Sequence, residues 1–262
     1  MRWFASPVAL ILARAGVVFV SLLATAPAQA ALSDVIARVT PSIVVVGTVQ
    51  KTRSPPFTFR ATGFVVGDGL LIATAAHAVP ETLQTEPPET MGVLIDVPGS
   101  SDPQGRVAQT VAVDRVHDVA LLRIGGAPLP VLRLGDSDAV REGTAIAFTG
   151  FPLGNALGFN AVTHRGIVSS RPPIALPSPT AKQLDARVIR SVQAGPFRLF
   201  QLDATAYPGH SGSPLYDAET GEVVGVVNMG IKATKDAAIG QATGISFAVP
   251  IKYLQDLLRG VR

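Results

Sequence analysis

The chain has 262 residues, of which 47% are hydrophobic and only 16% are charged, so a disordered chain is excluded and one large domain or two small ones are expected. It contains no cysteine, which excludes disulfide scaffolds, thiol nucleophiles and Cys-ligated zinc. The formal net charge is +3, and the 25 Gly and 21 Pro residues favour many short strands over long helices.

Residues 1–30 have the pattern of an export signal. Arg2 provides a positive start, residues 15–24 form an apolar segment, and Ala28-Gln29-Ala30 has the small residues of a cleavage site. Arg14 interrupts the wider apolar stretch, so the part that follows it is short for a membrane span. We therefore predict a cleaved signal peptide, with an uncleaved membrane anchor as the alternative.

Removal of the signal changes the interpretation of the charge. The two arginines of residues 1–30 go with it, which leaves 20 basic and 19 acidic residues and a net charge of about +1. No block of Lys or Arg remains in the mature chain. Nucleic acid is therefore not expected as a partner.

The rest of the chain consists of short apolar runs separated by Gly, Pro and Asp, which is typical of an all-β protein. Strands are predicted at Ser42–Thr48, Gly63–Val66, Leu70–Ala73, Val111–Val113, Val119–Ile124, Ala145–Phe148, Phe197–Leu202, Val223–Val227 and Ile245–Val249. Short helices are predicted at Leu32–Val39 and, after Pro250, at Ile251–Leu258. A Gly- and Pro-rich connector at 125–130 separates two all-β halves, and the proline-rich residues 171–194 predict a long surface loop.

A serine flanked by glycines is the first candidate for chemistry. Residues 209–212 read Gly-His-Ser-Gly and stand between two apolar stretches. Glycines on both sides allow a tight turn that projects the Ser211 hydroxyl and directs backbone N–H groups to one point. An acyl-transfer nucleophile with an oxyanion hole needs this arrangement, although a purely structural Gly-Ser turn has the same pattern.

A serine nucleophile needs a base, and the chain has four histidines. His77 follows a predicted strand that runs into small residues at 73–76, which leave room for an imidazole, although a structural core histidine is the alternative interpretation. His117 and His164 stand next to charged residues and are predicted to be surface groups. His210 precedes the serine directly, and because adjacent residues in a tight turn point apart, we expect it to be a poor base.

Asp118 is the candidate for the acid that orients the base. It begins an apolar strand, and a carboxylate held against the Nδ1–H of a histidine fixes its tautomer and stabilises the imidazolium. Asp114 is the competing candidate, and an ordinary strand-edge charge is the structural alternative for either residue.

The order of these residues discriminates among folds. No histidine follows Ser211, which excludes an α/β-hydrolase for this serine. A subtilisin-type order would need Asp34 or Asp68, neither of which has a suggestive context. The order His77, Asp118, Ser211 is that of chymotrypsin-type enzymes, in which the three residues are divided between two β-rich halves.

Five segments in the correct order resemble the trypsin-like serine proteases and, among them, the bacterial HtrA/Deg branch. These are a histidine strand and turn (61–66 and 74–79), an aspartate strand (117–124), an inter-barrel pattern (134–138, 143 and 150–154), a nucleophile loop (202–215) and a final strand (244–250). The resemblance implies an all-β, chymotrypsin-like fold of two six-stranded antiparallel β-barrels with a short C-terminal helix. Residues 31–125 would form the N-terminal barrel and residues 126–262 the C-terminal barrel.

The resemblance also implies a role for each matching residue. Ser211 is expected to be the nucleophile, His77 the general base and then acid, and Asp118 the residue that orients His77. The backbone N–H groups of Gly209 and Ser211 are expected to form the oxyanion hole, to which His210 contributes only backbone.

Substrate binding is implied for Thr205, Asn228, Met229, Gly230 and Gly244. Asn228 matches a position whose side chain supports the catalytic Asp, and the backbone from Asn228 to Gly230 is expected to pair with substrate as an added strand. Thr205 and Gly244 fall where the family lines its primary specificity pocket. Because neither is charged, we expect a neutral, small or medium apolar residue before the scissile bond.

Three features depart from the family pattern. Ser213 replaces a glycine of the usual Gly-Asn-Ser-Gly-Gly loop, and a serine there would crowd the turn if that position has a positive φ. The mature chain has no trypsin-style Ile-Val start, so activation by a buried new N-terminus is not expected. The sequence given ends twelve residues after Pro250, so the PDZ modules common in the Deg branch, with their trimeric cages and peptide-triggered activation, are not expected.

We therefore predict an exported serine endopeptidase, periplasmic or secreted, that cleaves unfolded or periplasmic proteins through an acyl-enzyme. No metal or cofactor is expected, because the chain has neither His-Glu-x-x-His nor a phosphate loop. The expected partner is a protein or peptide substrate, without stable membrane association if residues 1–30 are cleaved, and an oligomer remains open. The alternatives are a catalytically silent or latent binding or chaperone module, favoured by Ser213 and the loop at 171–194, and an esterase of the same fold.

Overall fold

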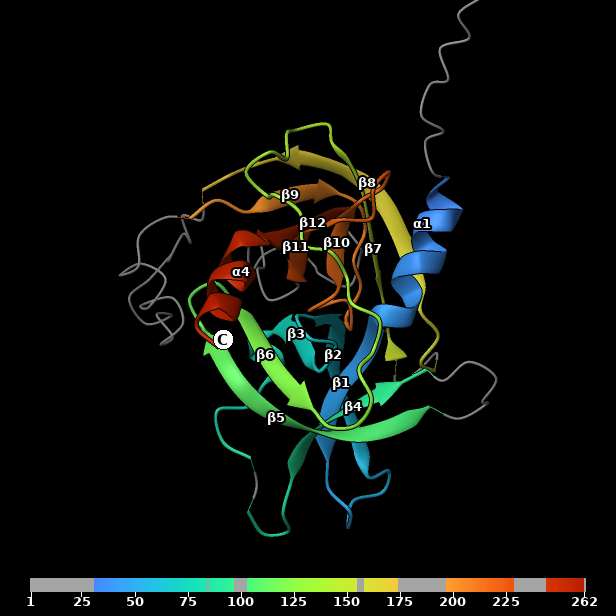
Figure 1. Cartoon of the computed structure of the whole chain (residues 1–262), viewed down its shortest axis with the longest axis vertical. Coiled ribbons are helices and arrows are strands. Elements are labelled where there is room, and N and C mark those ends of the chain that lie inside the picture. Colours follow the sequence, from blue (N-terminus) through green and yellow to red (C-terminus); the bar gives the residue numbers. More distant parts are fainter. Residues whose placement is uncertain are drawn as a thin grey trace, which may run out of the picture.

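Two β-barrels make up the protein, as seen in a computed structural model of the chain (Figure 1). The structure describes residues 31–83, 85–96, 103–154, 158–173, 197–228 and 244–261. The predicted export signal and most of the proline-rich loop, residues 174–196, lie outside these ranges. Each barrel is closed and consists of six antiparallel strands, so the predicted fold class is confirmed.

The first barrel precedes the connector at 125–130. Its strands are β1 (Ile43–Val49), β2 (Phe57–Val66), β3 (Leu71–Ala75), β4 (Thr90–Ile95), β5 (Gln104–Asp114) and β6 (Val119–Ile124). They are hydrogen-bonded in the order β1-β2-β3-β6-β5-β4, and β4 closes the barrel against β1. A short 3₁₀ turn, η1 (Thr40–Ser42), precedes β1, and a second one, η2 (Ala76–Ala78), follows β3.

The second barrel follows the connector. Its strands are β7 (Ala145–Gly150), β8 (Val162–Ser170), β9 (Phe200–Asp203), β10 (Pro214–Asp217), β11 (Val223–Asn228) and β12 (Ile245–Pro250). Their order in the barrel is β10-β11-β12-β9-β8-β7. The turn between β9 and β10 contains the candidate nucleophile, and the turn between β5 and β6 in the first barrel contains the candidate acid.

Strands at the contact between the barrels are buried on both faces, which explains their continuous apolar sequences. In β1, Val44 and Val46 belong to the core of the first barrel. Ile43 and Val45, which point to the opposite face, belong to a cluster that also contains Tyr216 of the second barrel. Burial of both faces therefore fixes the two barrels against each other and places the loops of one beside those of the other.

The two terminal helices also join the barrels. Helix α1 (Leu32–Val39) packs on the second barrel, where the turn at Gly221 lies against Val35 (Figure 1). Helix α4 (Lys252–Arg259) follows β12, contacts β5 and β6 of the first barrel, and buries Leu254 in the shared cluster. Among the described residues, no helix is long and apolar enough to cross a lipid bilayer.

The sequence-based prediction did not include β4, β8 or β10, and it gave only the ends of β2 (Gly63–Val66) and β5 (Val111–Val113). Strand β8 has mostly exposed or half-buried residues, with only Val168 buried, so its apolar pattern is weak. Strand β10 has only four residues and begins with Pro214, which is atypical of a strand. Both strands form because their neighbours in the barrel provide hydrogen-bond partners.

Candidate active site

His77 and Asp118 form a hydrogen-bonded pair between two turns of the first barrel. His77 lies in η2, directly after β3, and its Nδ1 is 2.6 Å from Oδ2 of Asp118. The backbone N–H of His77 donates to the other carboxylate oxygen, Oδ1, over 2.8 Å. Because a carboxylate only accepts, Nδ1 of a neutral His77 carries the proton and Nε2 presents a lone pair.

The carbonyl groups of η2 are fixed by two arginines. Arg60 donates from Nε to the carbonyl of Ala78 over 2.8 Å, and Arg115 donates to the carbonyls of Ala76 and Val79. Ala76 and Ala78, on either side of His77, are both buried. The backbone of η2 is thereby held in one position relative to the Asp118 turn.

Asp118 has an uncommon backbone conformation. Its φ is +55°, in the left-handed region, which costs a non-glycine residue of order 1–3 kcal/mol unless the surrounding structure imposes it. Its carbonyl accepts the N–H of Ala76 over 3.1 Å, and Asn228 Nδ2 donates to Asp118 Oδ2 over 2.8 Å. The side chain of Asn228 therefore reaches from β11 of the second barrel to the carboxylate of Asp118.

The nucleophile turn depends on two glycines with positive φ. Gly209 has a φ of +106° and Gly212 a φ of +82°. A Cβ at Gly209 would collide with the carbonyl oxygen of Phe151, and one at Gly212 with the carbonyl oxygen of Thr62. Neither position accepts a side chain, so these glycines allow Ser211 to project from a turn pressed closely against neighbouring backbone.

Thr62 links the first barrel to this turn. It lies on β2 and is fully buried; its hydroxyl donates to the carbonyl of Gly209 over 2.8 Å and accepts the N–H of Phe151 over 3.0 Å. Its backbone N–H donates to the carbonyl of Ser211 over 2.9 Å. Thr62 was not among the predicted site residues, and the only signal for it in the sequence is a threonine within an apolar run.

The turn leaves two donors free. The backbone N–H groups of Gly209 and Ser211 donate to no other group within the described ranges. The Ser211 residue is 5% exposed, and its hydroxyl makes no hydrogen bond to His77 or to any other described residue. Catalytic hydrogen bonds are often long before substrate binds, so this geometry is compatible with a reactive serine.

Ser213, the residue that departs from the family pattern, is accommodated without backbone strain. Its φ is not positive, so the condition under which a serine would crowd the turn is not met. Its side chain is fully buried beside Gly150, where a Cβ would collide with the Ser213 hydroxyl. Gly150 thus provides the space that the larger residue needs, although the hydroxyl has no hydrogen-bond partner in the described structure.

His210 is fully buried, with its side chain in the second barrel. Its Nδ1 accepts the N–H of Tyr207 over 3.0 Å, so it is not available as a base for Ser211. The ring of His164, on β8, lies perpendicular to it at 4.9 Å between centroids. Burial, together with the adjacent His164, lowers the pKa of His210 to about 4, and burial also lowers the pKa of His164.

This burial makes stability depend on pH. The folded-state pKa of His210 lies below its ordinary value of 6.5, so the unfolded chain binds more protons between these two values. The contribution of His210 to the free energy of unfolding is therefore fully present above pH 6.5, and we expect it to fall by about 2–3 kcal/mol between pH 7.5 and pH 4.5. Urea unfolding at both pH values, compared with the non-titrating variant His210→Asn, measures this contribution. An equal loss in the variant would contradict it.

The predictions for the two remaining histidines need correction. His164 and His117 are half-buried, not surface groups. His117 Nδ1 lies 2.6 Å from Asp114 Oδ2, and the imidazole stacks on Tyr253 of α4 with centroids 3.8 Å apart. Although burial opposes it, hydrogen bonds from His117 hold the pKa of Asp114 below its ordinary value. Asp114, the competing acid, thus pairs with a different histidine.

The structure describes both residues proposed to line the specificity pocket, Thr205 and Gly244. Thr205 is half-buried in the turn after β9, and the carbonyl of Gly244 accepts the N–H of Ala204. A side chain at Gly244 would meet no atom within 4 Å, although its φ of +72° favours glycine. Met229 and Gly230 lie outside the described residues.

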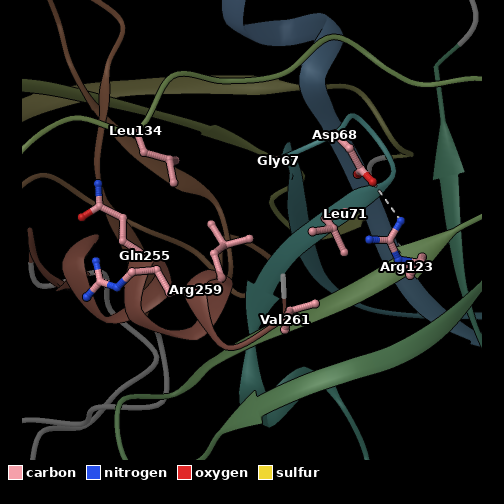
Figure 2. Close-up of a pocket in the computed structure, with 9 residues that line it drawn as sticks. Gly67, Asp68, Leu71, Arg123, Leu134, Gln255, Arg259 and Val261 are labelled. Atoms are coloured by element: carbon pink, nitrogen blue, oxygen red, sulfur yellow. Dashed lines mark hydrogen bonds and ion pairs between the residues drawn. The ribbon is translucent and has the colours of Figure 1, made fainter.

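A cavity of about 860 Å³ lies away from these residues (Figure 2). It is bounded by the turn at Gly67 and Asp68, by Arg123 of β6 and by Gln255 and Arg259 of α4. Its two walls come from the first barrel and the C-terminal helix, and it contains no residue predicted to act on substrate. In the described part of the chain, no group of three or more His, Asp or Glu residues is arranged to hold a metal ion.

Comparison with known proteins assigns the class that this fold and site suggest. A model of the trypsin-like peptidase domain matches residues 61–226, a range that includes His77, Asp118 and Ser211. The chain therefore belongs to the trypsin-like peptidase family.

Within that family, the similar proteins are of the HtrA type. The mitochondrial serine protease HTRA2 of Drosophila willistoni is 34% identical over 199 residues, which cover 76% of this chain and 38% of that protein. A Pseudomonas putida (strain GB-1) protein named "Probable periplasmic serine endoprotease DegP-like" is 28% identical over 208 residues, covering 79% of this chain and 37% of that protein. The chain thus spans 37–38% of the length of these relatives.

Solved structures show the same fold. The HtrA-type protease AlgW, determined with a tripeptide, superposes with a TM-score of 0.62 at 22% identity, covering 88% of this chain and 64% of that one. AlgW determined with a decapeptide has the same TM-score at 20% identity, covering 88% of this chain and 67% of that one. At this level of identity the likeness supports the fold of two barrels.

Proposed function

We propose that the protein is an exported serine endopeptidase that uses Ser211, His77 and Asp118. The observation that carries the proposal is that two features from different barrels lie beside each other. The carbonyl of Ser211 accepts the N–H of Thr62, and Gly212 lies against Ala75, two residues before His77. The first feature is the His77–Asp118 pair, which leaves the lone pair of His77 Nε2 free to accept a proton. The second is the glycine-flanked serine turn, in which two backbone N–H groups donate to no other described residue. Acyl transfer requires both features in one place.

The reaction would proceed in two halves. His77 Nε2 takes the proton of the Ser211 hydroxyl while Oγ attacks the scissile carbonyl, and the negative charge that develops on the carbonyl oxygen is bound by the N–H groups of Gly209 and Ser211. His77 then gives its proton to the leaving amine. Water, deprotonated by His77, releases the acyl group and restores the Ser211 hydroxyl. Asp118 stabilises the imidazolium in both halves, and Asn228 helps to hold its carboxylate.

The substrate is expected to be an extended polypeptide. Strand β11 ends at Asn228, and the residues that follow it, 229–230, are proposed to pair with substrate backbone as an added strand. Thr205 and Gly244 would line the pocket for the residue before the scissile bond, where the absence of charge favours a small or medium apolar side chain. The peptides bound by AlgW support a polypeptide ligand.

Export and periplasmic action belong to the same proposal. Residues 1–30 have the signal pattern, and the Pseudomonas putida relative is named as periplasmic. Unfolded or periplasmic proteins are therefore the proposed substrates. A latent or silent protease-fold module is the second candidate, because the Ser211 hydroxyl forms no hydrogen bond to His77 in this conformation.

A serine-reactive probe separates these functions. The purified chain, incubated with a fluorophosphonate, is expected to be labelled at Ser211 and to cleave unfolded casein, because the imidazole and the oxyanion donors activate that hydroxyl. Ser211→Ala is expected to lose both activities, whereas Ser169→Ala, which removes a β8 hydroxyl bonded to Gln201, retains them.

Each other outcome has a distinct meaning. Labelling of Ser211 without cleavage would indicate narrow specificity or an esterase. A folded chain that is neither labelled nor able to cleave casein would refute the competent enzyme and favour the latent or silent module. Labelling that appears only after a peptide is added would identify the latent form.

A further inference from the structure

His210 makes three hydrogen bonds that close the nucleophile turn on itself. Its backbone N–H donates to the carbonyl of Tyr207 over 3.0 Å, and its Nδ1 accepts the N–H of Tyr207 over 3.0 Å. Its carbonyl accepts the N–H of Ser213 over 2.9 Å. Two of these bonds use backbone that any residue supplies, and the bond to Nδ1 is specific to this side chain.

We propose that His210 is a positioning residue whose neutral imidazole holds the 207–211 turn in the form that leaves the Gly209 and Ser211 N–H groups free, and that protonation of this imidazole releases the turn. The inference rests on the proposed function for its catalytic consequence. It adds a side-chain role at a position where sequence resemblance assigned only backbone.

The hydrogen bond from Tyr207 defines the protonation state. A ring nitrogen that accepts an N–H must have its lone pair free, so the proton of a neutral His210 is on Nε2. An imidazolium would carry a proton on Nδ1 as well, directed at the Tyr207 N–H. Two donors would then face each other in a site that water does not reach, and the bond would be lost.

The surroundings of His210 favour the neutral form. The ring is fully buried; Phe148 of β7 meets it edge-on at 5.2 Å between centroids, and Gly150 of the same strand lies against it. The ionisable groups that face it are His164 of β8 and Tyr207 of its own turn, at 4.9 and 6.3 Å between ring centroids. Neither histidine has a carboxylate partner among the described residues, and the Nε2 atoms of both are buried without a hydrogen bond.

The turn transmits this state to the oxyanion donors. His210 stands between Gly209 and Ser211, whose carbonyl groups are already fixed by Thr62 of the first barrel. The carbonyl of Pro208 is also held, by the N–H of Leu153 over 2.8 Å. The Tyr207 N–H is therefore the group at this end of the turn that the imidazole secures. Loss of the Nδ1 bond leaves this N–H without a partner two residues before Gly209, and we expect the turn to shift in order to satisfy it.

The lowered pKa of His210 agrees with this geometry, because a buried imidazole without an anionic partner resists protonation. Burial lowers the pKa of His164 as well, so both imidazoles are neutral at pH 7. The release would thus occur only in acid, well below the pH at which an exposed histidine gains its proton.

Two substitutions separate a positioning role from simple packing. His210→Asn replaces Nδ1 with an amide oxygen that accepts the Tyr207 N–H and does not titrate. His210→Leu fills the same space but accepts nothing. At pH 8 we expect His210→Leu to lower kcat for a peptide substrate about tenfold to hundredfold with KM changed less than threefold, whereas His210→Asn stays within about fivefold of the original chain.

An NMR titration of the Ser211→Ala chain tests the same proposal without turnover. At pH 7 a long-range ¹H–¹⁵N spectrum is expected to show His210 Nδ1 as an acceptor nitrogen. On acidification, the His210 ring and the Tyr207 amide are expected to change with one shared midpoint, below pH 5.5. In the double variant Ser211→Ala, His210→Asn, the Tyr207 amide is expected to show no such midpoint.

Several results would overturn the proposal. These are an unchanged kcat in His210→Leu, a proton on Nδ1 at pH 7, a His210 midpoint near 6.5, or a Tyr207 amide that does not follow the imidazole. If His210→Leu does not fold, His210→Asn and the titration still decide. If the original chain neither labels nor cleaves, the proposed function fails, while the titration independently shows whether the imidazole holds the turn.

Discussion

Substitution of Asp118 by asparagine is expected to lower kcat by about 10⁴-fold while the chain remains folded. Asparagine has the shape of aspartate, and its oxygen can still accept the backbone N–H of His77, which Oδ1 of Asp118 now accepts. Its NH₂ group, however, would face Nδ1 of His77 in place of Oδ2. The imidazole would then carry its proton on Nε2 and could not accept the proton of Ser211.

The control for this change is Asp114→Asn, in the neighbouring Asp–His pair. Asp114 bonds to His117, and its Oδ1 accepts the N–H groups of Val116 and His117. An asparagine oxygen can continue to accept both N–H groups, so activity is expected to stay within about threefold. Kinetics on a peptide substrate, with circular dichroism to verify folding, compares the variants. A folded Asp118→Asn chain with nearly full kcat would show that Asp118 does not orient the base.

Substitution of Thr62 by valine is expected to damage both stability and turnover. Valine has nearly the same volume but no hydroxyl, so the carbonyl of Gly209 and the N–H of Phe151 would both lose their partner in a buried site. Two unsatisfied groups of this kind cost about 2–4 kcal/mol in the free energy of unfolding. Because one of them belongs to the nucleophile turn, kcat is also expected to fall about tenfold to hundredfold.

Two further variants serve as controls for Thr62→Val. Thr62→Ser keeps the hydroxyl and is expected to restore most of kcat. Thr149→Val removes another buried threonine hydroxyl, which bonds to Thr163 and Tyr216 within the second barrel. It is expected to lower stability without changing kcat per folded molecule. Urea unfolding and active-site titration measure the two effects separately, and equal kcat values for Thr62→Val and Thr149→Val would refute the cross-barrel role of Thr62.

The sequence alone was sufficient to place the three candidate catalytic residues on their elements. His77, Asp118 and Ser211 each stand in a local pattern of glycines, small residues or apolar strands, and their order in the chain selected one fold among several. Strands with continuous apolar runs were found because burial on both faces leaves a strong signal. Strand β8 was not, because its exposed face leaves almost no periodic pattern.

Contacts between residues far apart in the chain could not be predicted from local sequence patterns. Thr62 bonds to Gly209 across 147 positions, and no local pattern indicates which buried carbonyl a threonine will meet. Asp114 and His117 are only three residues apart, so a pair between them was possible from the sequence. Only the geometry of the turn shows that they form it. Gly150 and Ser213 compensate for each other's size only because β7 passes behind the nucleophile turn.

The sequence by itself therefore determined the fold class and the residue types available for chemistry, because strand periodicity, glycine turns and residue order are local properties of the chain. Tertiary structure alone decided how these residues meet: Asn228 reaching Asp118, Thr62 fixing the nucleophile turn, and His210 buried against His164. The physical reason is that burial and hydrogen-bond partnership depend on which strands lie side by side. Closure of two barrels against a shared apolar cluster sets that arrangement.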